Sequence, residues 1–256
     1  MDQRISDDWP KSVRGVARRT SRRLNDIFML TSFSVQGLLL VRDKLSETKR
    51  RAMDVVVLDH DGNEKTTTRR KKHLRPLLSA AVERMQVEYA LQSVIGETEA
   101  FLAFVLRAVL TKYPTKLVPG GKKLDISVVL DSASKDEIID RLVDDKVAST
   151  LYGSPAEYLE ALGQVVSTSI PSSVAGPFAE VKATRDIVIH AKGIANGTYV
   201  KKARKYARVE PGVLIPVDHA YLRHATAVAR KLVRFIAQAV QDKFGGSSVA
   251  RTSQGG

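Results

Sequence analysis

Arg185 and His190 are the two residues of this sequence whose types and spacing suggest a chemical reaction. On a helix, five residues span about 7.5 Å of rise and about 140° of rotation, so the two side chains would flank one face without stacking. A neutral imidazole can take the proton from a ribose 2′-hydroxyl, and a guanidinium can neutralise the charge on a phosphorane-like transition state. The pair therefore suggests RNA cleavage that needs no metal or other cofactor, with Arg185 and His190 as the catalytic residues.

Asp186 lies four residues before His190, a spacing at which two side chains of one helix can touch. The carboxylate would then hold one imidazole nitrogen, which fixes the tautomer and raises the basicity of the other nitrogen. One helix provides only one Arg and one His. We therefore expect a homodimer whose two-fold axis brings together one His as base and another as acid. The alternative is an ordinary Asp–His pair on an exposed helix.

Residues 182–208 are strongly basic, with eight Lys or Arg against one Asp, and they surround the candidate catalytic pair. Tyr199 and Tyr206 are interleaved with the basic residues and are suited to stacking on unpaired bases. We expect this segment to bind RNA through Lys192, Asn196, Tyr199, Lys201, Lys202, Arg204 and Lys205. The alternative is a solvated helix face with tyrosines in the core.

The segment 184–206, followed by a long final helix, resembles the catalytic end of the HEPN superfamily, and most closely its RiboL-PSP-HEPN type. Six positions match the family's motif and the frame that follows it: Arg185, Asp186, His190, Gly193, Asn196 and Tyr199. The chain departs from many members at Ala191, where a polar residue, often Asn, directly follows the His. The resemblance covers residues 177–250, extends to the helices at 74–112 and does not include 114–170.

The resemblance implies a helical bundle that dimerises and that is often a metal-independent endoribonuclease, acting as a toxin or in defence against phage. A toxin of this kind would have an antitoxin or another regulatory protein as a further partner. HEPN proteins without catalysis also exist. Two other functions therefore stay open: a non-catalytic module that binds RNA or a nucleotide, and a helical scaffold that is the partner protein of a toxin–antitoxin pair.

The composition is that of a globular protein, with 43% hydrophobic and 27% charged residues. A net charge of +13 favours a polyanionic partner, either nucleic acid or an anionic membrane surface. The absence of cysteine excludes disulfides, Cys-based zinc sites and thiol nucleophiles. No apolar run reaches about 18 residues, and the N-terminus has no apolar core of a secretory signal. We therefore expect a cytoplasmic protein without a membrane partner.

The N-terminal segment 1–23 is also basic, with seven Lys or Arg against three Asp. Arg14, Arg18 and Arg22 recur at four-residue steps, and like charges at this spacing weaken an isolated helix. We therefore expect a flexible arm. The arm is either solvated or a polyanion-binding segment.

The hydrophobic spacing predicts an all-α fold, an elaborated helical bundle of HEPN-like type. The expected helices are 24–45, 74–94, 98–112, 134–150, 154–168, 177–192 and 218–244. Ser134, Ser154 and Asp218 are the expected N-caps of three of them. They would form one domain over 24–246, with a helical insertion at 114–170, a linker at 170–176 and a disordered tail at 247–256.

A small β-hairpin is expected at 53–68, where three consecutive valines precede Asp61-Gly62 and three threonines follow. His60 lies between Asp59 and Asp61, an arrangement that suggests a metal site. At a turn with glycine beside it, local hydrogen bonds are the stronger prediction.

Overall fold

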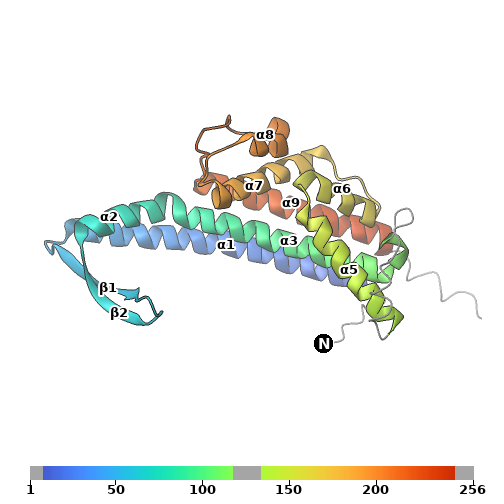
Figure 1. Cartoon of the computed structure of the whole chain (residues 1–256), viewed down its shortest axis with the longest axis horizontal. Helices are drawn as coiled ribbons and strands as arrows, with labels where there is room; N and C mark the ends of the chain where they lie inside the picture. Colours follow the sequence, from blue (N-terminus) through green and yellow to red (C-terminus); the bar gives the residue numbers. More distant parts are fainter. Residues whose placement is uncertain (1–7, 118–133, 246–256) are drawn as a thin grey trace, which may run out of the picture.

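The computed structural model describes residues 8–117 and 134–245 of the chain. Helix α1 (Trp9–Glu47) and helix α3 (Gln86–Lys112) are long and antiparallel, and α9 (His219–Phe244) packs against both (Figure 1). Helix α7 (Ser172–His190) lies on α9 and carries the candidate catalytic pair. The described residues thus confirm an all-α bundle with a small inserted hairpin.

The hairpin connects α1 to α2 (Lys71–Ala80) and lies at one end of the bundle (Figure 1). Strand β1 (Ala52–Leu58) pairs with β2 (Glu64–Arg70) in antiparallel register, from Ala52 opposite Arg70 to Leu58 opposite Glu64. The predicted hairpin is therefore confirmed, and each strand is a little longer than expected.

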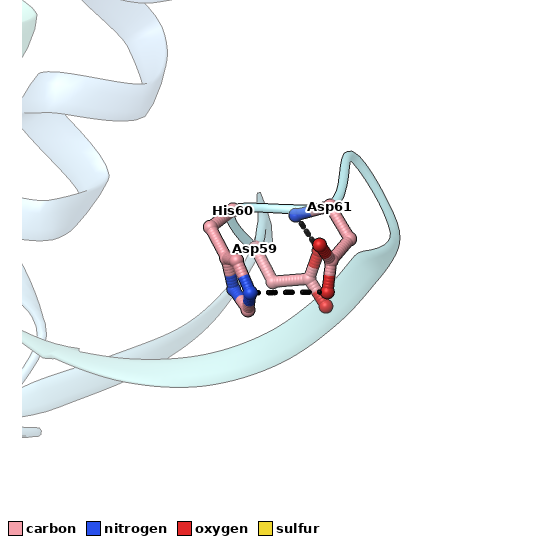
Figure 2. Close-up of side chains that lie close together, drawn as sticks. All are labelled: Asp59, His60 and Asp61. Atoms are coloured by element: carbon pink, nitrogen blue, oxygen red, sulfur yellow. Dashed lines mark hydrogen bonds and ion pairs between the residues drawn. The ribbon is translucent and has the colours of Figure 1, made fainter.

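The tip of the hairpin is held by local hydrogen bonds (Figure 2). Oδ1 of Asp59 accepts the backbone N–H groups of Asp61 and Asn63, each at 2.9 Å. These backbone bonds, that of Asn63 first, lower the pKa of the Asp59 carboxyl. Nε2 of His60 lies 3.2 Å from Oδ2 of Asp61, and both side chains are exposed. The prediction of local hydrogen bonds at this turn is therefore confirmed.

The flexible arm predicted at 1–23 is wrong from Trp9 onward, because these residues are the first turns of α1. One stripe of α1 is buried at three- and four-residue steps: Trp9, Val13, Ala17, Thr20 and Leu24. Burying one large apolar side chain contributes about 1.5–3 kcal/mol. The repulsion between like charges on a helix is only about 0.2–0.5 kcal/mol per pair, so burial of the stripe outweighs it. Residues 1–7 lie outside the described residues.

Residues Lys71 to Lys112 form one continuous helical rod. α2 is followed by a π-helical turn (Ala81–Met85) and then by α3. The break predicted between 94 and 98 is wrong, and Gly96 lies within α3. Glycine in a helix interior costs about 1 kcal/mol, which burial of the residues on both sides of Gly96 outweighs.

Helices α5 (Lys135–Tyr152) and α6 (Pro155–Val166) begin at the predicted caps. Oγ of Ser134 accepts the N–H of Glu137, and Ser154 forms a complete capping box with the residue three positions on. Both helices pack on α3, so they belong to the same bundle. Residues 118–133 of the expected insertion and the expected tail lie outside the described residues.

The linker predicted at 170–176 is wrong from Ser172 onward, where α7 begins. Pro177 lies inside α7 and has no N–H for the carbonyl of Ser173, four residues earlier. Nζ of Lys231 on α9 donates to that carbonyl at 3.3 Å. A tertiary hydrogen bond thus replaces the helical one that proline removes.

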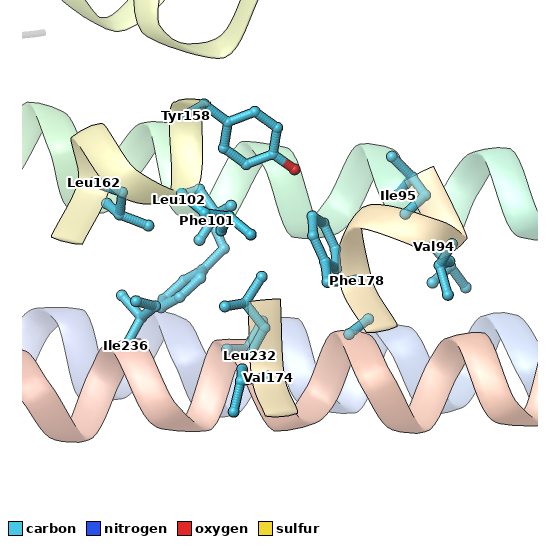
Figure 3. Packing of buried hydrophobic residues seen from close by; sticks show 14 of the residues in the cluster. Val94, Ile95, Phe101, Leu102, Tyr158, Leu162, Val174, Phe178, Leu232 and Ile236 are labelled. Carbon is cyan, nitrogen blue, oxygen red and sulfur yellow. The ribbon is translucent and has the colours of Figure 1, made fainter. Parts of the chain in front are cut away.

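Helices α3, α6, α7 and α9 meet in one hydrophobic core (Figure 3). Their central side chains are fully or almost fully buried: Phe101, Leu102, Tyr158, Leu162, Phe178, Leu232 and Ile236. The core extends along α7 from Val174 to Ile187, and α7 then ends at His190, ahead of α8 (Gly197–Ala203) and a short 3₁₀ helix (Arg204–Tyr206). The core therefore positions the end of α7.

The second half of α1 has an apolar face that no described residue covers. Its large side chains are exposed: Met29, Leu30, Phe33, Leu40 and Val41. By length and composition α1 also contains a window able to cross a membrane, and only 11% of that window is buried in the described bundle. The expectation that the chain lacks a membrane-spanning segment is therefore not confirmed.

Candidate nucleic-acid site at the end of helix α7

Helix α7 and the segment after it bring most of the predicted site residues to one pocket. The pocket has a volume of about 520 Å³ and lies where the last turns of α7 meet α8 and the end of α5. Six predicted residues line it: Arg185, Asp186, His190, Asn196, Tyr199 and Lys202. Arg185 and His190 therefore line the same pocket.

Arg185 is held by two carboxylates, and 18% of its side chain is exposed. Its Nη2 donates to Oε2 of Glu99 at 3.0 Å, and its Nη1 lies 3.4 Å from Oδ1 of Asp186. Nε of Arg185 is buried and has no hydrogen-bond partner among the described residues. The guanidinium therefore has anionic partners within the folded chain, and one of its N–H groups has no acceptor.

The predicted contact between Asp186 and His190 is wrong. The Asp186 carboxylate instead lies 3.1 Å from Nζ of Lys202 and 3.5 Å from Nζ of Lys182. Full positive charges attract a carboxylate more strongly than a neutral imidazole does. His190 is the last residue of α7, is exposed, and forms no hydrogen bond or ion pair with any described residue. Nothing in the described chain thus fixes the tautomer of His190.

Glu99 is a residue of the site that the sequence patterns did not indicate. Its Oε1 lies 2.9 Å from Nζ of Lys182, whose side chain is only 10% exposed. Five residues form one cluster, called here the α7 charge cluster: Glu99, Lys182, Arg185, Asp186 and Lys202. Three cations meet two carboxylates, which leaves one positive charge in excess. No sequence signal distinguished Glu99 from Glu97, which is also acidic and lies two residues earlier.

Tyr158 of α6 lies close to this cluster and is almost completely buried. Burial raises the pKa of Tyr158 well above its ordinary 10, and the Glu99 carboxylate raises it further. The Tyr158 hydroxyl has no hydrogen-bond partner among the described residues. It therefore remains a neutral phenol beside the charged residues at neutral pH.

Tyr199, predicted to stack on RNA bases, is a core residue with 1% exposure. Its hydroxyl donates to Oε1 of Glu180 at 3.2 Å and accepts the backbone N–H of Arg208 at 2.9 Å. Burial raises the pKa of Tyr199. The stacking prediction is therefore wrong, because the ring lies in the core and presents no face to a base.

Glu180 explains why Tyr199 is buried. This carboxylate is 3% exposed and accepts hydrogen bonds from four side chains: Thr184, Tyr199, Arg208 and Tyr221. Nε of Arg208 lies 2.9 Å from Oε1 of Glu180, and its guanidinium stacks on the Tyr221 ring at 3.6 Å. A buried carboxylate needs such partners, so this network fixes the segment after α7 against α7 and α9.

The other predicted RNA contacts divide into structural and exposed residues. Oδ1 of Asn196 caps α8 by accepting the N–H of Tyr199 at 3.0 Å. Nζ of Lys202 is paired with Asp186. The remaining four are exposed on the segment around the pocket: Lys192, Lys201, Arg204 and Lys205.

Tyr206, also predicted to stack on bases, packs instead against α7. A Cβ atom at Gly176 would overlap its ring, and its hydroxyl donates to the Ser172 carbonyl at 3.1 Å. The Nζ of Lys205 lies 5.5 Å from the centre of the same ring. The aromatic part of the predicted RNA surface is thus engaged within the protein, while much of its basic part is exposed.

Comparisons of the chain with protein-family models, with curated proteins and with solved structures give no match. The resemblance to the HEPN superfamily therefore stays a prediction that rests on the motif residues alone.

Proposed function

We propose that the chain is a metal-independent endoribonuclease of HEPN type, which acts as a homodimer with Arg185 and His190 as its catalytic residues. The observation that supports this function best is that both residues line one open pocket of about 520 Å³. The pocket is large enough for a nucleotide and lies beside exposed basic residues of the 182–208 segment. A role as a toxin or in defence against phage belongs to the same proposal.

In the proposed reaction, a ring nitrogen of His190 takes the proton of a ribose 2′-hydroxyl. The 2′-oxygen bonds to the adjacent phosphorus, and the bond from phosphorus to the 5′-oxygen breaks. The partner's His190 in the homodimer gives a proton to the departing 5′-oxygen. Arg185 neutralises charge on the phosphorane through its guanidinium. The products are a 2′,3′-cyclic phosphate and a 5′-hydroxyl.

An apolar patch beside His190 supports the homodimer. Four exposed residues form it: Ile189, Ile194, Val213 and Leu214. Ile189 directly precedes His190, and Ile194 pairs with Leu214 through a β-bridge. Self-association through this patch would remove apolar surface from water and bring two His190 side chains toward one substrate.

The test is incubation of RNA with wild type, His190→Ala and Arg185→Ala in EDTA, followed by analysis of the cleaved ends. We expect wild type to give 2′,3′-cyclic phosphate ends and both variants to be inactive. His73→Ala is the matched control, because His73 is also an exposed histidine but lies outside the pocket. Cleavage by His190→Ala at the wild-type rate would falsify the proposal.

A non-catalytic RNA- or nucleotide-binding module is the second candidate, and a specific observation favours it. Arg185 is paired with Glu99 and Asp186, while His190 has no residue to orient it among those described. For this function, RNA binding persists in His190→Ala and weakens steeply with salt, because phosphate neutralisation releases counterions.

A further inference from the structure

A second basic site lies between α1 and α9, which pack side by side along the bundle (Figure 1). The groove there has a volume of about 500 Å³. Five arginines line it: Arg14, Arg18, Arg22, Arg230 and Arg234. No residue lining the groove is acidic, and none of them lines the His190 pocket. The two pockets are therefore separate sites.

The arginines form two rows. Arg14, Arg18 and Arg22 repeat every four residues along α1, which corresponds to about 6 Å between successive positions. Arg230 and Arg234 repeat at the same step on α9. Like charges at this spacing weaken a helix, so the arrangement is unfavourable in the absence of an anion.

None of the five arginines forms an ion pair or hydrogen bond with any described residue. Arg230 is partly buried and the other four arginines are exposed. Elsewhere the described chain pairs a partly buried arginine with a carboxylate, as Arg185 with Glu99. Among the described residues, Asp242 is hydrogen-bonded to a residue of the groove, because it accepts from Nε2 of Gln238 at 2.7 Å. Within the described chain it forms no ion pair with the arginines. The positive charge of the groove is thus left without a protein counter-charge.

Two donors in the groove are buried and lack acceptors. Nε of Arg230 and Nε2 of Gln241 are inaccessible to solvent and have no hydrogen-bond partner among the described residues. Buried donors are almost always satisfied, and these two are exceptions. Both atoms belong to residues that line the groove.

We propose that the α1–α9 groove binds consecutive phosphates of a single-stranded nucleic acid. Guanidinium groups bind phosphate through paired, charge-assisted hydrogen bonds, and two rows of them match a repeating anion better than an isolated one. No aromatic side chain lines the groove, so it contacts the backbone and does not stack on bases. Binding here is independent of base sequence. Arg14, Arg18 and Arg22 thus bind these phosphates from helix α1, across the groove from α9.

The test is fluorescence anisotropy with a labelled single-stranded DNA oligonucleotide at several salt concentrations. DNA lacks the 2′-hydroxyl and cannot be cleaved by the reaction proposed above, so the two proposals are tested separately. The groove variant is Arg18→Gln with Arg234→Gln. The control is Arg19→Gln with Arg223→Gln, which removes the same charge from the same helices at exposed positions outside the groove.

We expect the groove variant to bind about tenfold more weakly or worse, and the control to change affinity less than about twofold. The slope of log affinity against log salt should fall by about 1.4 for the groove variant, since each lost phosphate contact on a single strand removes about 0.7. Equal losses in the two variants would overturn the proposal. Circular dichroism checks that both variants are folded.

Competition with inorganic phosphate and with a mononucleotide distinguishes the source of the anion. If phosphate and the mononucleotide displace the oligonucleotide only at far higher concentrations, the result supports binding of a polymer. Displacement by either at comparable concentration, or binding of anionic vesicles alone, would contradict it.

Discussion

Nη2 of Arg185 donates to Oε2 of Glu99 at 3.0 Å, a contact between residues that are 86 positions apart. Glu99 also pairs with Lys182 at 2.9 Å, so one carboxylate of α3 holds two cations of α7. This carboxylate holds the proposed catalytic arginine, and it would compete for that arginine with a phosphate of the proposed substrate. Glu97 lies two residues away and forms a more exposed ion pair. It therefore serves as the control for the effect of removing a carboxylate from this part of α3.

Glu99→Gln should destabilise the fold and alter the pocket. The substitution removes the carboxylate that pairs with the partly buried Arg185 and Lys182. We therefore expect the free energy of unfolding to fall by about 2 kcal/mol. Glu97→Gln should change it by less than about 1 kcal/mol, because its partner Arg23 is mostly exposed. Urea denaturation measures both. Equal effects of the two substitutions would show that Glu99 has no special place in the α7 charge cluster.

Tyr199→Phe separates stacking from packing. The change removes the hydroxyl that bonds Glu180 and the N–H of Arg208, and we expect a loss of about 1–2 kcal/mol in stability. RNA affinity should be unchanged in the folded variant, because the ring is buried. Tyr89→Phe is the control at an exposed tyrosine and should leave stability unchanged. Loss of RNA affinity in folded Tyr199→Phe would restore the stacking prediction.

Alkaline pH should unfold the protein through its buried tyrosines. Burial raises the pKa of Tyr158, Tyr199 and Tyr221, so the folded state keeps protons that the unfolded state releases near pH 10. Stability contributed by these groups is therefore fully present below pH 10 and is lost as the pH rises from 10 through the folded values.

The measurement is unfolding as a function of pH, with tyrosine ionisation followed by ultraviolet absorbance. Tyr158→Phe should move the loss of stability to higher pH, since one of the titrating groups is gone. Tyr152→Phe is the control, because Tyr152 is 94% exposed. An identical alkaline transition in Tyr158→Phe and wild type would count against a contribution from Tyr158.

Gly176→Ala and Gly37→Ala should have opposite effects. A Cβ atom at Gly176 would overlap the Tyr206 ring, so we expect a loss of about 1–3 kcal/mol and displacement of the basic segment that the ring anchors. Nothing lies within 4 Å of a Cβ atom at Gly37, which is inside α1. That alanine should stabilise the helix by about 0.5–1 kcal/mol. Thermal unfolding compares them, and two changes of the same sign would contradict this expectation.

Ile189→Glu should disrupt the proposed homodimer and abolish cleavage while His190 remains present. A charge in the apolar patch is unfavourable in a buried interface, so sedimentation should show a monomer. Leu30→Glu tests the other exposed apolar face, on α1. A monomer produced by Leu30→Glu and not by Ile189→Glu would place the self-association surface on α1 and away from the site.

The helix starts were the most predictable part of the fold. Ser134, Ser154 and Asp218 each accept a backbone N–H three residues on, and each was predicted as a cap. The hairpin turn at Asp59 was predictable for the same reason, because its bonds join residues four or fewer positions apart. By contrast, the N-terminal segment and residues 172–176 were predicted as arm and linker. Their helices depend on burial against distant elements.

The sequence by itself determined that Arg185 and His190 lie near each other, because helical spacing links residues five positions apart. Only the tertiary structure decided what those residues contact. Packing of α3 against α7 pairs Arg185 with Glu99, and burial of Glu180 draws Tyr199 into the core. Periodicity and capping are properties of consecutive residues. Burial and ion pairing depend on which helices meet, and that choice is made by the whole hydrophobic core.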